Sequence, residues 1–123
     1  MSPKAKNIIY WILTGFVAFI FIASATAKLT GNAEMLKMAE KFGLDANTYA
    51  ILGGVELVSV LLFIYPRTGI LGSLLLIAYM GGAIATHLEH GESIIAPCII
   101  QAFIWVVAVL RFPELKSRIF SKK

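Results

Sequence analysis

YAILGGVELVSVLLFIY, from Tyr49 to Tyr65, is the stretch of sequence that decides the fold. It is apolar and long enough to cross the hydrocarbon core of a bilayer, and it has a tyrosine at each end, where interfacial aromatic side chains gather. Pro66 follows directly and predicts where the helix ends. Glu56 lies near the middle, where an isolated carboxylate costs about 2.5–3.5 kcal/mol on insertion scales. The stretch therefore predicts a membrane span in which Glu56 has a partner.

The composition of the whole chain is that of an integral membrane protein. Its 123 residues are 59% hydrophobic and 15% charged, with a mean hydropathy of +0.82, and the apolar residues fall into long blocks. This length allows one domain. The net charge is +4, but the basic residues flank the apolar blocks, so we expect no nucleic-acid partner. A single cysteine, Cys98, excludes an internal disulfide.

Four apolar segments predict an all-α fold in one domain, residues 1–123. We place the membrane spans at about residues 8–28, 49–65, 69–87 and 93–111. Short connections follow the second and third spans, which favours antiparallel neighbours and an integral membrane up-down four-helix bundle. In the longer first loop, Met35, Met38 and Phe42 have amphipathic helical spacing, and Gly43 follows. We expect a short amphipathic helix there, lying on the outer membrane interface.

Lysine and arginine residues predict the orientation of the spans. Lys4 and Lys6 precede the first span, Arg67 separates the second from the third, and several basic residues follow the fourth. The positive-inside rule then places both termini in the cytoplasm. An alternative is a secretory signal cleaved after Ala27, because small residues follow the first apolar run, although that run is long for a signal.

This topology places polar side chains from all four spans in the outer half of the bundle. Lys28 and His87 fall at the outer ends of the first and third spans, and Glu56 and Gln101 fall at similar depths in the second and fourth. We expect Lys28 to reach Glu56, since a long lysine stem can point inward. Tyr79 is deep enough either to hydrogen-bond Glu56 or simply to fill the core.

These five residues are our candidates for ligand binding or proton handling, and each also has a structural interpretation. Lys28 can snorkel to the headgroups, His87 can cap its helix, and Gln101 can bond a neighbouring helix. No catalytic residue is identified. The histidines and glutamates around residues 87–92 match no tight metal spacing, so no metal is expected. A cavity lined otherwise by apolar side chains would suit a quinone-like or lipid-like ligand, with no covalently bound cofactor.

Several short motifs lie along the chain between Ile8 and Leu110. They are Lys28-Leu29-Thr30-Gly31, Gly43-Leu44, Leu52-Gly53-Gly54-Val55-Glu56-Leu57, Pro66-Arg67-Thr68, and Tyr79-Met80-Gly81-Gly82-Ala83 with His87. Together they give the chain a sequence that resembles the DoxX-like family of small four-helix membrane proteins. The resemblance implies a multi-pass protein of the bacterial inner (cytoplasmic) membrane. The family takes its name from a subunit associated with quinol oxidase and thiosulfate:quinone oxidoreductase activity.

Two classes of function follow. The first is a redox-linked, quinone-associated membrane subunit with a polar site in the outer half of the bundle, where Glu56 or His87 handles protons. The second is a non-enzymatic assembly or chaperone-like factor that packs against a partner membrane protein. The sequence has no electron-carrying ligand set, which favours a subunit or accessory protein over a self-sufficient enzyme. Expected partners are the lipid bilayer and either another membrane protein or a second copy of the chain.

Overall fold

The computed structural model describes residues 2–120, and this part of the chain is all α-helical, without strands. The predicted all-α class is therefore confirmed. In chain order the elements are α1 (Pro3–Thr30), α2 (Ala33–Lys41), α3 (Ala46–Ile64), the short 3-10 helix η1 (Pro66–Thr68), α4 (Gly69–Glu89), α5 (Ile95–Arg111) and α6 (Pro113–Ile119).

Three to four of these helices are long and apolar enough to span a membrane. α1 and α3 pass that test alone, and α4 passes it as one continuous segment with η1, Pro66–Glu89. α5 passes it only together with α6, which turns away by 111°. α5 has 17 residues, about 26 Å of helix, and matches the predicted fourth span at residues 93–111. α6 is an additional helix beyond the four predicted spans. Its start follows from Pro113, whose fixed φ and missing N–H suit a first helical position.

The amphipathic helix predicted in the first loop is confirmed as α2. The Asn32 side chain caps it by accepting from the Met35 amide at 2.9 Å, and Gly43 follows it with a φ of 70°. The Asp45 carboxylate caps α3 by accepting from the Thr48 amide at 2.7 Å. Hydrogen bonds from Thr48 hold the pKa of Asp45 below its usual value. The cap is therefore formed above the unfolded-state pKa and lost as the pH falls through the lowered one.

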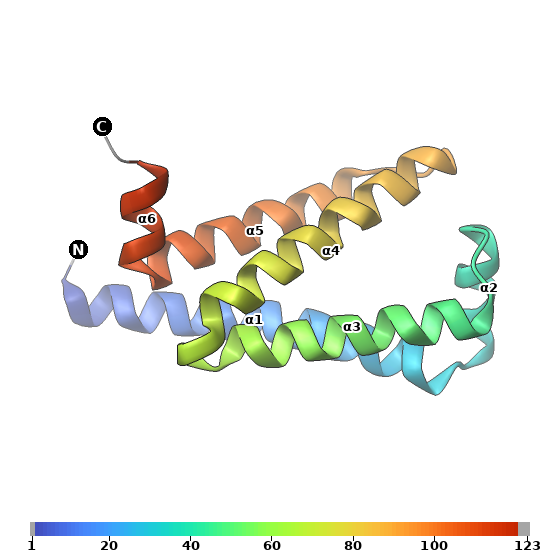
Figure 1. Ribbon diagram of the computed structural model, residues 1–123, viewed down its shortest axis with the longest axis horizontal. Helices are drawn as coiled ribbons and strands as arrows, with labels where there is room; N and C mark the ends of the chain where they lie inside the picture. The colour runs from blue at the N-terminus through green and yellow to red at the C-terminus, as the bar shows by residue number, and fades with distance from the viewer. Residues whose placement is uncertain (1, 121–123) are drawn as a thin grey trace.

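The four long helices form a ring in which α1 packs on α3 and α5, and α4 packs on the same two helices. Figure 1 shows the α1–α3 pair and the α4–α5 pair diverging toward the end that α2 occupies, here named the α2 end. The hydrophobic core is formed by side chains from all four long helices: Val17, Ala18, Phe21, Val60, Phe63, Leu76, Met80, Ile104 and Val107.

Arg111 closes the core at the α6 end. Its place at the end of the fourth predicted span, beside Lys116 and Arg118, is typical of an exposed basic residue, but its side chain is buried. Its guanidinium donates to the carbonyls of Phe63 at 2.6 Å and Ile64 at 3.0 Å. The last carbonyls of a helix lack intrahelical donors, so Arg111 caps the carboxyl end of α3. The guanidinium also lies 4.9 Å from the centre of the Trp11 ring.

The start of α1 and the whole of α6 lie at the same end of the bundle, as an even number of spans requires (Figure 1). Which side of the membrane that end faces stays a prediction. Reporter domains fused after Arg67 and after Lys123 should read as cytoplasmic, and one fused after Gly91 as external, because the basic residues flank the first two sites. An external signal from the reporter after Lys123 would show that the spans have the opposite orientation in the membrane. The intact mass of the purified protein will show whether the chain is cleaved after Ala27.

Candidate functional site

The predicted contact between Lys28 and Glu56 is present in the structure. The Lys28 ammonium on α1 lies 2.8 Å from Oε1 of Glu56 on α3, and the two side chains are 12% and 2% exposed. Gly53, one turn before Glu56, allows the helices to come this close. A Cβ at Gly53 would lie 2.9 Å from Cβ of Lys28 and 3.2 Å from the Ala25 carbonyl oxygen. Lys28 therefore points inward to Glu56 and does not snorkel to the headgroups.

Two hydroxyl groups complete the surroundings of this ion pair. Ser24 accepts from the Lys28 ammonium at 2.6 Å and donates to Oε1 of Glu56 at 3.2 Å. Tyr79 on α4 donates to the same oxygen at 3.3 Å, so it does more than fill the core. Among residues 2–120, Glu56 Oε1 thus receives three donors, whereas Oε2 receives none and is not fully buried. Oε2 is free to accept a hydrogen bond from a ligand.

Two tyrosine rings flank the ammonium. The Lys28 Nζ atom lies 5.4 Å from the centre of the Tyr49 ring and 5.8 Å from that of the Tyr79 ring, within the range of cation–π attraction. The position of Tyr49 at the start of a span predicts an interfacial aromatic side chain. Its burial to 7% exposure instead makes it part of the site.

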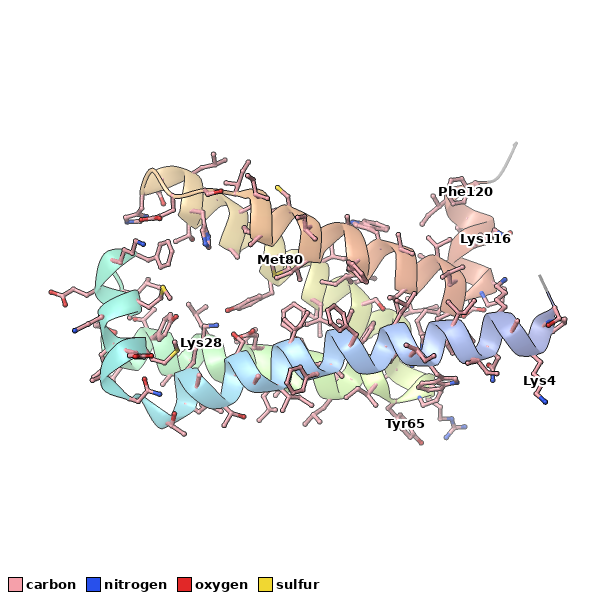
Figure 2. All side chains as sticks on the ribbon, turned by 180° about the vertical axis from the view of Figure 1, so that it is seen from behind. Lys4, Lys28, Tyr65, Met80, Lys116 and Phe120 are labelled. Carbon is pink, nitrogen blue, oxygen red and sulfur yellow. The ribbon has the colours of Figure 1, made fainter. Side chains whose placement is uncertain are left out.

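A cavity of about 460 Å³ opens beside the ion pair, between the diverging helix pairs. Its walls come from α1, α3, α4, α5 and the segment after α2, and Figure 2 shows Lys28 and Met80 on two of these walls. The polar lining residues are Ser24, Lys28, Tyr49, Glu56, Tyr79, Thr86 and His87. The apolar ones are Ile20, Phe21, Phe42, Leu44, Leu52, Ala78, Met80, Gly82, Ala83, Ala96, Pro97 and Ile100. A few polar groups in an otherwise apolar cavity are typical of a small-molecule site.

His87 lines the cavity from α4 and does not cap that helix with its side chain. Its Nδ1 atom lies 2.6 Å from the Ala83 carbonyl oxygen. Because a carbonyl can only accept, Nδ1 carries the hydrogen, and Nε2 of the neutral ring is left as an acceptor. The imidazole also stacks at a tilt on Phe42, with 4.7 Å between ring centres. The ring is thereby fixed at the cavity wall.

The segment after α2 covers the α2 end of the cavity. Phe42 and Leu44 line the cavity, and Phe42 contacts both His87 and His90. An ion pair of 3.0 Å joins Lys41 to Glu92 in the loop between α4 and α5. Both of its side chains are partly exposed, so we assign it little energy. The spacing of apolar residues predicts an amphipathic helix in this loop, but it does not predict a contact between the loop and the site.

Gln101 does not line the cavity, which corrects its expected place beside Glu56 and His87. Its Nε2 atom donates to the Ile77 carbonyl of α4 at 3.1 Å, and its Oε1 is buried without a partner. The cavity wall on α5 is made instead by Ala96, Pro97 and Ile100. Each residue turns the helix by about 100°, so a residue at the expected position along α5 can face α4 instead of the cavity, as Gln101 does. Gln101 is an interhelical hydrogen-bond donor.

Fold and site together define a multi-pass membrane protein with a buried ion pair at a cavity between its helices. The chain belongs to the DoxX-like family, whose match covers residues 12–110 and so includes every residue of the cavity wall. No curated protein and no solved structure matches the chain. Within residues 2–120, no three His, Cys, Asp or Glu side chains are placed to hold a metal ion.

Proposed function

We propose that the protein is a redox-linked membrane subunit that binds a quinone-like molecule in the cavity beside Lys28 and Glu56. The observation that carries this proposal is a buried ion pair at the wall of a largely apolar cavity of about 460 Å³. A quinone combines a flat ring that carries two oxygens with an apolar tail. The apolar walls suit the ring and tail, and the few polar groups suit the oxygens.

The polar groups of the cavity offer partners to both redox forms of such a ligand. The Lys28 ammonium has three N–H donors and uses two of them on Ser24 and Glu56, so the third suits a carbonyl oxygen of the oxidised form. Glu56 Oε2 and His87 Nε2 are acceptors, which suit the hydroxyl groups of the reduced form. Oxidation of the reduced form releases two protons and two electrons. In this proposal the protons pass in turn to Glu56 or His87, and a partner redox protein accepts both electrons.

A thermal-shift experiment tests the binding step. A short-tailed quinone such as decylubiquinone, added to the detergent-purified protein at 100 times its Kd, should stabilise it by about 2.7 kcal/mol. Glu56→Leu and His87→Leu should each remove most of this gain, because both residues line the cavity and each substitution removes a hydrogen-bond acceptor. Glu114→Gln is the matched control, since it neutralises an exposed carboxylate on α6, far from the cavity, and should keep the full gain.

Decyl alcohol provides the second control, because it carries the same tail without the ring. An equal stabilisation by the alcohol would show that the cavity takes any lipid-like molecule, and no stabilisation by the quinone would contradict the proposal. In that case a non-enzymatic assembly or chaperone-like role becomes the better explanation. A pull-down from native membranes then separates the two, since a redox enzyme should co-purify under our proposal and a non-redox client under the alternative.

A further inference from the structure

A second cavity, of about 410 Å³, lies at the opposite end of the bundle from the Lys28–Glu56 pair. It lies between the first turns of α1 and the helix α6. Its lining residues are Lys6, Pro113, Lys116, Ser117 and Phe120. None of them lines the first cavity, so this feature is independent of the proposed quinone site.

The bend between α5 and α6 builds this cavity. α6 turns by 111° from α5, and positions 113, 116, 117 and 120 then share one of its faces, since they have the spacing of helical neighbours. That face lies toward Lys6 on α1. Figure 2 shows Lys116 on α6 and Phe120 directly after it, at the end of the molecule where α1 begins.

The cavity is positively charged and has a polar and an apolar part. Neither Lys6 nor Lys116 forms an ion pair with any residue from 2 to 120, so both ammonium groups can bind an anion. Ser117 adds a hydroxyl donor, and the Phe120 ring, 65% exposed, adds an apolar surface. Two cations and a hydroxyl beside exposed apolar groups match a phosphate attached to a hydrocarbon chain.

The position of the cavity along the bundle fits a membrane surface. α5 ends at Arg111, and a helix that turns by 111° from a spanning helix runs near the plane of the bilayer. The exposed apolar side chains Ile119 and Phe120 and the basic residues Lys116 and Arg118 all belong to this short segment. Basic clusters directly beside a span attract anionic lipids.

We propose that Lys6, Lys116 and Ser117 bind the phosphodiester of an anionic phospholipid. Phe120 and Pro113 contact the first methylene groups of its acyl chains. The lipid joins α6 to the start of α1, and this role requires neither a quinone nor a redox partner. A free phosphate ion could contact the same three side chains, and the experiment below distinguishes this ion from the lipid.

The test measures lipid affinity by native mass spectrometry of the full-length protein in detergent, with added phosphatidylglycerol or phosphatidylcholine. We expect tighter binding of phosphatidylglycerol, and a loss of about fivefold for each of Lys6→Ala and Lys116→Ala, with the two losses multiplying in the double variant. Lys4→Ala with Arg118→Ala is the matched control: it removes the same charge from the same end of the molecule, but neither residue lines the cavity. This control should lose much less affinity.

Three outcomes would overturn the proposal. The first is equal affinity for phosphatidylglycerol and phosphatidylcholine. The second is an equal loss of affinity in the control variant, which would indicate a diffuse basic surface. The third is complete displacement of the lipid by millimolar inorganic phosphate. The thermal midpoint of each variant in phosphatidylcholine shows whether it is folded. Ser117→Ala provides a second check, because it keeps the charge and should still weaken phosphatidylglycerol binding.

Discussion

Replacing Lys28 with alanine should destabilise the protein by about 3 kcal/mol, because removing one partner of a buried ion pair leaves the other charge uncompensated. Glu56 would keep only Ser24 and Tyr79 as donors, in a position where its side chain is 2% exposed. The free energy of unfolding, measured by denaturant titration in mixed micelles, checks this value. Lys37→Ala is the control, since Lys37 is exposed on α2 and should change stability by no more than about 0.5 kcal/mol.

Glu56→Gln should be milder than Lys28→Ala. The amide oxygen of glutamine can still accept from Ser24 and Tyr79, and the Lys28 ammonium keeps Ser24, two tyrosine rings and 12% exposure. The double variant should cost less than the sum of the two single changes, because the residues interact directly. If Glu56→Gln lowered the free energy of unfolding as much as Lys28→Ala or more, the ion pair would not hold α1 to α3 in this way. The same conclusion would follow if the two losses simply added in the double variant.

The ion pair could be predicted because it depends mainly on depth in the membrane. The rise per residue fixes how far Lys28 and Glu56 lie from the same end of the bundle, and a buried carboxylate requires a partner. The spans and α2 could be predicted for a similar reason, since they follow from long apolar blocks and from amphipathic spacing. Ser24 was missed although its signal was present: it lies one turn before Lys28, on the same helix face.

The sequence does not predict how far each helix is rotated about its own axis, and this rotation decides which neighbour a side chain faces. Depth alone places Gln101 beside Glu56, but the rotation of α5 turns it toward the backbone of α4. The same limit applies to Tyr49, whose place at the start of a span fits an interfacial ring as well as a buried one. Phe42 lines the cavity because of how the first loop folds, and the periodicity of the sequence does not predict that fold.

Two features at the α6 end could not be predicted from the sequence: the buried Arg111 that caps α3, and the second cavity with Lys116. The positive-inside rule explains any basic residue beside a span, so it does not separate the buried Arg111 from exposed neighbours such as Lys116. The burial of Arg111 depends on carbonyls of α3 and on the Trp11 ring, which are distant in sequence. The bend into α6 had a local signal in Phe112-Pro113, because the residue before a proline favours extended backbone.

The contact between α3 and α4 depends on a second glycine, Gly72. A Cβ at this position would overlap the backbone nitrogen and Cα of Phe63, and it would lie 2.5 Å from the Leu62 carbonyl carbon. Backbone atoms cannot move aside as a flexible side chain does. The three-residue η1 turn also joins the two helices near this point, so they cannot separate without changing the turn. Gly72 therefore sets the distance between α3 and α4.

Gly72→Ala should consequently destabilise the protein by about 3 kcal/mol, the upper part of the range for overpacked cores. Gly81→Ala, on the same helix, should have the opposite sign: a Cβ there has no atom within 4 Å, and alanine favours a helix over glycine by about 1 kcal/mol. The two free energies of unfolding, measured in the same micelles, give the comparison. Because glycine→alanine is the same chemical change in both, propensity cannot explain opposite signs, and only the close approach of Phe63 can. Equal signs would mean that α3 and α4 are farther apart than the structure places them.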